Sequence, residues 1–264
     1  MSQDDAIHNI SQWGVHKEPE RRREILVDEI RVPLNQPADY AVLSGCLPPF
    51  NAPDIFHSLK HILEHFGVTY TFLSKEYCCG FLPLLQPAII AKDHARIERL
   101  KPVTENFMWK NIEQAKALGC KGLVTVCAPC EANYSNIKHE AGIDIYHYHG
   151  FLASLFEGGR LDRSADYYAG CVKFRRGISN VSFNSEPIRS ILSKIAGLYV
   201  NTIDRKLCCF VPSQMEKIVE SITTNYVITS CTGCRDKLAK EVKVKKGVDV
   251  RFLTEVMWES LRNS

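Results

Sequence analysis

Short apolar runs alternate with amphipathic segments over most of the chain. The run 40–44 predicts a buried strand that ends near Cys46. Residues 54–66 place their apolar side chains along one face of a helix. Residues 68–73 predict a second strand, which leads to the pair Cys78-Cys79. Such alternation is typical of strands that are joined by helices.

The same alternation continues through the rest of the chain. It predicts a helical region over residues 88–118 and a helix over residues 187–196. The further strands that it predicts cover residues 122–126, 143–146, 167–171, 198–203, 226–230 and 248–252. Each cysteine motif follows the carboxyl end of one of these strands, which is where such folds place their ligands.

Two stretches of the chain match each other closely. Cys130 lies ahead of Gly142-Ile-Asp-Ile-Tyr, and Cys234 lies ahead of Gly247-Val-Asp-Val-Arg. The offset is 104 residues at the cysteine and 105 residues at the glycine. A repeat of about 100 residues is longer than the repeats of solenoid proteins, so it indicates two related domains.

Strands that are apolar along their whole length are typical of parallel sheets covered by helices. We therefore predict an α/β fold with two related, pseudo-twofold domains, each a small parallel sheet flanked by helices. The expected parts are an N-terminal helical arm over residues 1–38, a first domain over 39–160 and a second domain over 161–264. The charged segment 18–30 of the arm is either a solvated surface helix or a docking arm for a partner subunit.

The composition narrows the possible functions. With 24% charged and 45% hydrophobic residues, the chain of 264 residues is globular rather than disordered. A net charge of +3 argues against nucleic acid as the main partner. The start is acidic and lacks the apolar core of a secretion signal, and no run reaches the roughly eighteen apolar residues of a membrane span. We expect a cytoplasmic protein that reaches a membrane only through its partners.

The eleven cysteines are the most informative residues. In a reducing compartment they serve metal binding or catalysis, and a disulfide framework stays open only for an exported chain. Ten of them form two sets with the same order, namely a single cysteine, an adjacent pair and a Cys-x-x-Cys motif: Cys46, Cys78, Cys79, Cys127 and Cys130, then Cys171, Cys208, Cys209, Cys231 and Cys234. The remaining Cys120 precedes a predicted strand, and we interpret it as structural.

The number and spacing of the thiols favour one kind of metal centre. Thiolates are soft ligands that select iron–sulfur clusters, zinc or copper(I). Adjacent cysteines in an extended segment point to opposite sides, so the pairs fit a large, irregular cluster more naturally than one small ion. Five thiolates per set also exceed the four that a structural zinc accepts. Zinc, with one cysteine of each set left idle, remains an alternative.

These motifs resemble those of the CCG cysteine-rich domain family, in Gly45-Cys46, Cys78-Cys79-Gly80 and Cys127-x-x-Cys130. Two copies over residues 40–264 resemble the B-type subunit of heterodisulfide reductase and its relatives. The resemblance implies that each set binds one noncubane 4Fe-4S cluster, with all ten cysteines as ligands. It also implies disulfide chemistry at the two clusters, and we expect the adjacent pairs to form the catalytic centre: Cys78, Cys79, Cys208 and Cys209.

The implied function is that of an oxidoreductase subunit that acts on sulfur groups within a heterodisulfide reductase-like complex. Its substrate would be a small disulfide or thiol, and its partners would resemble the A-type flavoprotein and the C-type, ferredoxin-like protein of heterodisulfide reductase. The sequence has no Gly-x-Gly-x-x-Gly motif and no P-loop, so no flavin or nucleotide site is indicated in this chain. Two alternatives remain: an electron-transfer or membrane-docking subunit of a glycolate, lactate or succinate type of dehydrogenase, and a zinc-stabilised interaction scaffold.

Several other residues change details of this picture. His147, or the nearby His149, follows a strand of the first domain and is a candidate proton donor to a substrate thiolate. The helical series His57, His61 and His65 is interpreted as a surface stripe.

Phe210 stands where the family has glycine, and its ring lies either beside the metal or in the core. Only 21 residues separate Cys209 from Cys231, against 47 between Cys79 and Cys127, so the second domain is expected to lack about one helix.

Overall fold

The computed structural model describes residues 1–170, 178–179, 181–203 and 207–264. By their internal contacts, these residues divide into two compact units. The first unit holds Met1–Phe50, Gly67–His147 and the described part of 175–181. The second unit holds Asn51–Phe66 and the described parts of Tyr148–Phe174 and Ser182–Ser264. Each unit is built around its own sheet.

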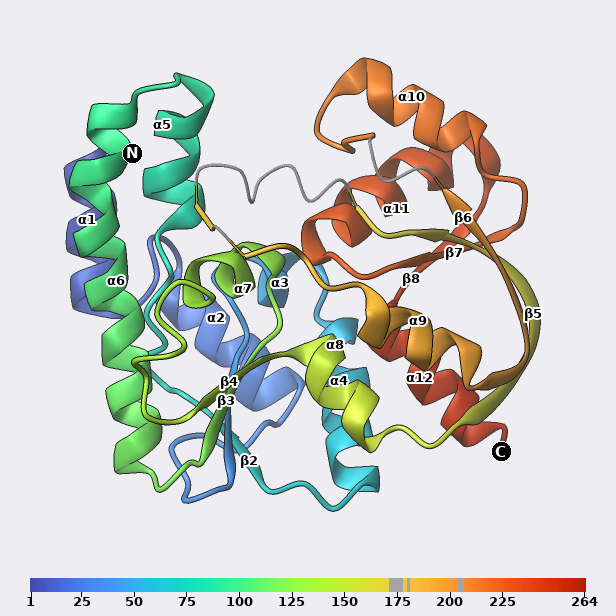
Figure 1. Cartoon of the computed structure of the whole chain (residues 1–264), viewed down its shortest axis with the longest axis horizontal. Helices are drawn as coiled ribbons and strands as arrows, with labels where there is room; N and C mark the ends of the chain where they lie inside the picture. The colour runs from blue at the N-terminus through green and yellow to red at the C-terminus, as the bar shows by residue number, and fades with distance from the viewer. Residues whose placement is uncertain (171–177, 180, 204–206) are drawn as a thin grey trace. The chain divides into compact units, whose positions relative to one another are not determined.

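The sheet of the first unit is parallel throughout (Figure 1). Its strands are β1 (Tyr40–Leu43), β2 (Tyr70–Phe72), β3 (Gly122–Thr125) and β4 (Asp144–His147), in the order β2-β1-β3-β4. All residues of β2 and β3 are buried, as expected for strands of a covered sheet. The chain steps from β1 to β2 on one side and then to β3 on the other, so the order reverses at β1.

The helices of the first unit include the predicted N-terminal arm. They are α1 (Gln3–Trp13), α2 (Pro19–Glu24), the π-helical turns η1 (Ile25–Glu29) and η2 (Phe81–Leu85), α3 (Pro48–Asn51), α5 (Gln86–Ile90), α6 (His94–Ala117) and α7 (Ala128–Tyr134). A capping box between Ser2 and Asp5 begins α1. Asp93 caps α6 by accepting a hydrogen bond from the backbone N–H of Arg96.

The interpretation of segment 18–30 as a solvated surface helix holds for one face only. Arg22, Ile25, Leu26 and Ile30 are all at most 4% exposed, and they pack within the first unit. The arm was expected to be solvated because its charged residues outnumber its apolar ones. Its few apolar side chains, at helical spacing, are nevertheless sufficient to bury one face.

The sheet of the second unit has the same order as the first. Its parallel strands are β5 (Gly159–Tyr168), β6 (Ile195–Ile203), β7 (Tyr226–Thr229) and β8 (Asp249–Phe252), in the order β6-β5-β7-β8. Two four-stranded parallel sheets flanked by helices confirm the predicted fold class. The strand predicted at 167–171 begins earlier, at Gly159, because the exposed, charged first half of β5 hides the strand pattern. The helix predicted to reach residue 196 ends at Ser193, where the chain turns into β6.

The helices of the second unit are α4 (Asp54–His65), α8 (Tyr148–Leu155), α9 (Glu186–Ser193), α10 (Pro212–Glu220), α11 (Thr232–Lys246) and α12 (Leu253–Arg262). Helix α4 lies between β1 and β2 in sequence, yet it packs against α12. Ser58 Oγ is 2.7 Å from Thr254 Oγ1, and the ring of His61 stacks on Trp258 with 4.9 Å between centroids. The compact units therefore differ from the sequence ranges expected for the repeat, which stay a prediction.

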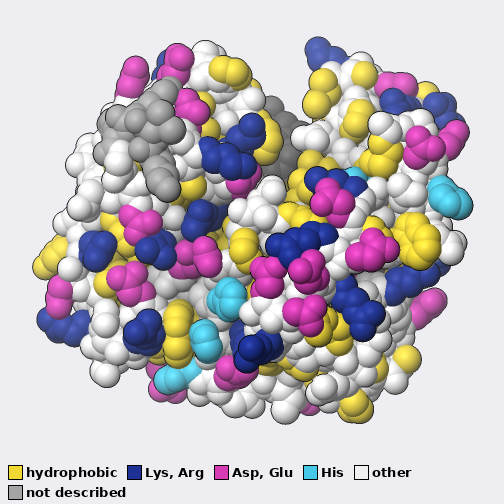
Figure 2. All heavy atoms as spheres, turned by 180° about the vertical axis from the view of Figure 1, so that it is seen from behind, with side chains coloured by type: hydrophobic (Ala, Val, Ile, Leu, Met, Phe, Trp, Pro, Cys, Tyr) yellow, Lys and Arg dark blue, Asp and Glu magenta, His cyan; other side chains and the backbone are white. Residues whose placement is uncertain are grey.

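The surface of the described residues agrees with several expectations from composition. His61 and His65 are exposed on α4, as expected of a surface stripe. Basic and acidic side chains are interspersed on the face in Figure 2, so this face carries no extended field of one sign. Within the described ranges, no helix combines the length and the apolar character that crossing a membrane requires.

Asp166, on β5, anchors the loop that precedes β7. The fully buried carboxylate accepts hydrogen bonds from Asn201 Nδ2, at 2.8 Å, and from the backbone N–H groups of Thr223 and Thr224, at 2.8 and 2.7 Å. Burial raises the pKa of Asp166, but these hydrogen bonds outweigh it and hold the pKa below the ordinary value of 3.8. The ionised carboxylate is therefore a stabilising element of the second unit.

Replacing Asp166 by asparagine should lower the free energy of unfolding by about 1.5–3 kcal/mol at pH 7, since hydrogen bonds to a charged group are lost. The depressed pKa means that the full contribution is present above the ordinary pKa of 3.8 and fades as the pH falls through the lower folded value. Urea unfolding of wild type and Asp166→Asn at pH 7 and at acid pH measures this. The exposed Asp162→Asn is the matched control, and an equal effect of both variants would contradict the assignment.

Candidate metal centre

The first cysteine set lies where β1, β2 and β3 end. Cys46 follows β1, the pair Cys78-Cys79 follows β2, and Cys127 follows β3 as the N-cap of α7. Parallel strands share one carboxyl edge, and the strand order reverses at β1, which is where folds of this kind bind their ligands. The topology therefore brings together thiols that are separated by up to 84 residues in sequence.

Glycine ahead of the first cysteine allows the ends of β1 and β3 to approach. A Cβ atom on Gly45 would lie 2.8 Å from Cys127 Cβ, closer than real Cβ contacts, and Gly45 has φ = 79°. Gly170 in the second unit has φ = 80°, and a Cβ there would lie 3.3 Å from Cys234 Sγ. Both units thus place a glycine of left-handed conformation against a Cys-x-x-Cys turn.

The five thiols of the first set form a continuous series of contacts. All five are buried, with at most 8% of each residue exposed. Side-chain contacts connect successive members in the order Cys46, Cys78, Cys79, Cys130 and Cys127. The Sγ atoms of Cys79 and Cys130 are 3.3 Å apart. The structure therefore brings together all five residues that were predicted from the sequence as the first set.

In two of the contacting pairs, Cys46 with Cys78 and Cys79 with Cys130, the two thiols have pKa values shifted in opposite directions. The contact with Cys78, aided by His16, lowers the pKa of Cys46 to about 6, while the same contact raises the pKa of Cys78. Contacts from Cys130 and then Cys78 lower the pKa of Cys79 well below its ordinary value, and the pKa of Cys130 is raised. Closely spaced thiols cannot all ionise together, because like charges repel. A bound metal centre would supply the positive charge that allows it.

The adjacent pair Cys78-Cys79 lies on a sharp turn, as a shared centre requires. Gly80 has φ = 74° and leads into η2, and its N–H is 3.4 Å from Cys78 Sγ. Asn133 Nδ2 donates to the carbonyl of Cys79 at 3.2 Å, which ties the turn to α7. π-Helical turns occur frequently at functional sites.

A buried ion pair between Arg22 and Glu76 fixes the turn that carries Cys46 of the first centre. Glu76 Oε1 accepts from the N–H of Gly45 at 2.7 Å, and its Oε2 accepts from the N–H of Ser44 at 2.8 Å. Arg22 of α2 donates to the same Oε2 at 2.5 Å, and both charged residues are at most 4% exposed. The pair connects the N-terminal arm to the turn that presents Cys46. Sequence reasoning missed it, since an arginine in a charged segment gives no sign of burial.

His16 is a second residue that sequence reasoning missed. It belongs to the loop after α1, and one donor atom from each of His16, Cys46 and Cys78 lies within 4.8 Å of the other two. Within the described part of the chain, these three donors are close enough together to hold one metal ion. A single histidine in a polar arm carries no sequence pattern that would have indicated this position.

The second set is described in part. Cys171 lies outside the described residues, and Cys208 is half-buried, with its N–H donating to Gln214 Oε1 at 2.7 Å. The Sγ atoms of Cys209 and Cys234 are 3.4 Å apart, which matches the 3.3 Å between Cys79 and Cys130 in the first set. The contact with Cys234 lowers the pKa of Cys231 to about 7. The contacts of Cys234 with Cys209 and Cys231 thus repeat those of Cys130 with Cys79 and Cys127.

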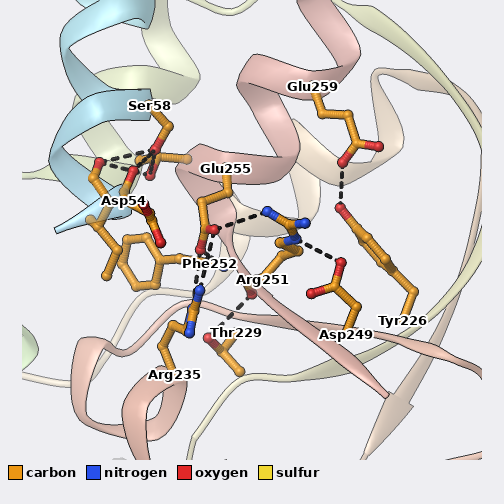
Figure 3. A network of polar contacts seen from close by, with 12 residues as sticks. Asp54, Ser58, Tyr226, Thr229, Arg235, Asp249, Arg251, Phe252, Glu255 and Glu259 are labelled. Carbon is orange, nitrogen blue, oxygen red and sulfur yellow. Dashed lines mark hydrogen bonds and ion pairs between the residues drawn. The ribbon is translucent and has the colours of Figure 1, made fainter. Parts of the chain in front are cut away.

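Helix α11 is held at the second centre by a polar network (Figure 3). Glu255 on α12 accepts from Arg235, at 3.2 Å, and from the N–H of Phe252, at 2.7 Å. Arg251 adds a weaker contact to Glu255, at 3.4 Å. Arg235 directly follows Cys234, so the network fixes the first turn of α11 and, with it, the second half of the Cys-x-x-Cys motif.

The position of Phe210 differs from that of its glycine counterpart in the first unit. Phe210 is not among the described residues with positive φ, whereas Gly80 is. Its side chain is 57% exposed, so the expectation that it packs in the core is wrong. The ring lies against Gly233 of the Cys231–Cys234 turn, 3.6 Å from the position of a Cβ there, with Lys237 Nζ 5.4 Å above it. The segment between Cys209 and Cys231 is also shorter than the one between Cys79 and Cys127, because it contains α10 where the first unit has α5 and the long α6.

Replacing Phe210 by glycine should raise the reduction potential of one centre in the iron-loaded protein and leave the other unchanged. Removing the ring exposes the Cys-x-x-Cys turn to water, and water favours the more highly charged reduced state. Redox titration followed by EPR spectroscopy measures both potentials. The exposed Tyr199→Gly, on β6, is the control. Equal shifts of both centres, or none, would contradict the assignment.

The donor set fits a polynuclear centre. Two thiolates on one metal atom lie about 3.7 Å apart, if each metal–sulfur bond is about 2.3 Å. The spacings of 3.3 and 3.4 Å are close to this value and well beyond the roughly 2.05 Å of a disulfide. Five thiols and a nearby histidine exceed the four ligands of a structural zinc.

Comparison with known proteins identifies part of the chain. Residues 40–134 match the family model of the CCG cysteine-rich domain. The CCG match includes all five cysteines of the first set and ends before the second set begins. CCG domains occur in oxidoreductase-related iron–sulfur proteins. Residues 40–134 thus match a cysteine-rich domain of a kind that is compatible with iron–sulfur clusters, and the second copy remains a prediction.

Other comparisons add little to the CCG match. No curated protein matches this chain in sequence. Glutamate racemase from Francisella tularensis subsp. tularensis SCHU S4, solved with D-glutamate, is 13% identical, with a TM-score of 0.37 over 85% of this chain and 78% of that chain. PH1733, an aspartate racemase homologue from Pyrococcus horikoshii OT3, is 14% identical, with a TM-score of 0.35 over 84% and 96%. Structural similarity at this level says nothing about the chemistry of this chain.

Cys120 lies apart from the CCG thiols. It precedes β3, at the amino edge of the sheet, whereas the first set lies at the carboxyl edge. Burial raises the pKa of the Cys120 thiol, which makes it a poor nucleophile and a poor ligand. This position agrees with its interpretation as a structural residue.

The Cys120→Ser variant should therefore keep its iron and sulfide content within about 10% of wild type, because none of the predicted ligands is touched. Its free energy of unfolding should fall by about 1–3 kcal/mol, since a hydroxyl replaces a buried thiol. Metal analysis and urea unfolding of the anaerobically purified variant measure both. Loss of half the iron would show that the ligand assignment is wrong.

The predicted proton donor His147 ends β4, at the same edge of the sheet as Cys127. Its Nδ1 donates to the carbonyl of Thr125 at 2.8 Å, which orients the ring. His149 belongs to α8 of the second unit, where it is buried edge-on to Phe183. The role of His147 remains a prediction.

Proposed function

We propose that this protein is the iron–sulfur subunit of a heterodisulfide reductase-like complex, which reduces or forms a disulfide or thiol-type sulfur substrate. The observation that supports it best is the first centre, with five buried thiols at the strand-order reversal of a parallel sheet. The repeated Gly45 and Gly170 turns, and the matching Sγ separations, support a second centre of the same kind. We propose two noncubane 4Fe-4S clusters as the cofactors.

The residues of this chain would hold the clusters and shape their surroundings. When bound, such a cluster supplies one-electron storage next to a sulfur substrate. The ligands would be the ten predicted cysteines, and the adjacent pairs at 78–79 and 208–209 would present the reactive side of each centre. The apolar core around Cys209 and Cys234 would shield these two thiols from water. His147 would supply a proton to a product thiolate.

The proposed partners would deliver or accept the electrons of the reaction. Cleaving a disulfide takes two electrons and two protons, and the sequence shows no flavin or nucleotide motif that could deliver them. We propose two proteins as the electron donors or acceptors, one like the A-type flavoprotein of heterodisulfide reductase and one like its C-type, ferredoxin-like protein.

Metal analysis is the first experiment. The anaerobically purified full chain should hold about eight irons and a similar amount of acid-labile sulfide, with four irons per set, as the family's clusters do. Stoichiometric zinc without sulfide would contradict the proposal and favour the interaction scaffold.

Turnover is the second experiment. The iron-loaded chain, given an artificial one-electron donor, should release thiols from small disulfides. A panel of symmetrical and mixed disulfides would show which class is accepted. Intact clusters that are reduced by the donor but turn over no disulfide would instead favour the electron-transfer or membrane-docking role.

A further inference from the structure

We propose that His16 is a sixth donor of the first centre, an imidazole ligand to the metal atom shared with Cys46 and Cys78. The proposal rests on the proposed function in taking that metal to be iron. It adds a nitrogen from the N-terminal arm, which lies outside the residues of the CCG match, to a centre otherwise made of thiolates.

The three donors are close enough to share one metal atom. One ring nitrogen of His16 and the Sγ atoms of Cys46 and Cys78 all lie within 4.8 Å of one another. Donors bound to one tetrahedral metal lie about 3.3–3.8 Å apart, given metal–ligand bonds of about 2.0–2.3 Å. A shift of less than about 1.5 Å, within reach of a side-chain rotation, therefore converts the observed spacing into a coordinated one.

The imidazole has an unused buried nitrogen. His16 is 8% exposed, and its Nδ1 has no solvent contact and no hydrogen-bond partner among the described residues. A buried polar atom without a partner is unfavourable by about 1–3 kcal/mol, so such atoms call for an explanation. A metal ligated by the ring would leave one nitrogen bonded to the metal and the other protonated.

The loop that carries His16 is fixed on the centre. The backbone N–H of Cys78 donates to the carbonyl of Gly14 at 2.7 Å, so the loop is bonded directly to a predicted ligand. Asn9 Nδ2 donates to the carbonyl of His16 at 3.1 Å, and Val15 is buried beside it. These contacts hold the histidine toward the thiols rather than toward solvent.

A neutral imidazole changes the electronic character of the centre. Replacing thiolate by imidazole ligands raises the reduction potential of an iron–sulfur centre, because less negative charge surrounds the iron. His16 would thus make the first centre easier to reduce than the same centre with a cysteine at position 16. The arm would tune the redox chemistry of the domain on which it packs.

The test uses the full chain, labelled with ¹⁵N-histidine and purified anaerobically. Wild type should show a ¹⁵N coupling in the ENDOR spectrum of a paramagnetic state of the first centre, and His16→Ala should lose it. The exposed His61→Ala is the matched control and should keep the coupling. A coupling that persists in His16→Ala, or that is absent from wild type with full iron content, would overturn the proposal.

A second variant guards against misfolding of His16→Ala. His16→Cys restores a ligand but adds a negative charge, so it should lower the potential of one centre and leave the other unchanged. Unchanged potentials in a folded, iron-loaded His16→Cys variant would overturn the proposal. Iron and sulfide analysis of the same wild-type sample tests the proposed function separately. Should wild type hold zinc, the proposed function fails, and Co²⁺ substitution tests His16 through the change in its visible bands between wild type and His16→Ala.

Discussion

Replacing Cys79 by serine is expected to remove the first centre and about half of the iron of the protein. Cys79 contacts both Cys130 and Cys78, and these contacts lower its pKa, which favours the thiolate form that a metal binds. A serine hydroxyl is a hard, protonated group at neutral pH, so it cannot replace a soft thiolate ligand. Disulfide turnover should fall by at least about tenfold, because a metal ligand is lost.

Metal analysis and EPR spectroscopy of two matched variants check this result. Cys209→Ser changes the equivalent position of the second set and should remove the other half of the iron. The Cys79 and Cys209 variants should then retain complementary EPR signals. If either variant loses all the iron, the two sets do not bind independent centres. If neither loses any, these thiols are not ligands.

The Glu76→Ala variant is expected to lose about 3–5 kcal/mol of stability, since it leaves the buried Arg22 guanidinium without its carboxylate. It also leaves the N–H groups of Ser44 and Gly45 without their acceptor, at the turn that presents Cys46. The first centre should therefore load iron poorly even where the chain still folds. Chemical unfolding and iron content, measured on the same preparation, test both effects.

An exposed ion pair of the same arm provides the control. Arg21 and Glu24 lie 2.9 Å apart with about half of each side chain exposed, so Glu24→Ala should change stability by less than about 1 kcal/mol. Arg22→Met should be nearly as destabilising as Glu76→Ala, because it leaves the carboxylate buried. Equal, small effects of the Glu24 and Glu76 variants would show that the buried pair does not support the centre.

The sequence was most informative where a single force decides the structure. The strands β1, β3 and β7 are short, largely apolar and buried runs, and burial on both faces leaves such a run few other structures. The thiols converge because parallel strands share one carboxyl edge, so strand order alone brings Cys46 and Cys127 together. Spacing and residue type therefore indicated which thiols lie together in the first unit, and their role as ligands stays a prediction.

Features that depend on distant partners could not be predicted in the same way. The first half of β5 is exposed and charged, and only pairing with β6 makes it a strand. Arg22 and His16 lie in a polar arm, where burial depends on Glu76 and Cys78, more than fifty residues away. No local pattern distinguishes such residues from solvated ones, since the information lies in the tertiary contact.

The packing of α4 against α12 has a consequence for how the chain can fold during synthesis. Ser58 and Thr254 are in contact although 196 residues separate them. Contacts of such long range slow folding, because a large loop must close before they form. The second unit can be completed only after α12 has been synthesised. Until then α4, which comes early in the chain, lacks the helix against which it packs. A gene cut between residues 160 and 161 would give α12 without α4, the helix against which it packs, so we expect neither half to form its compact unit alone.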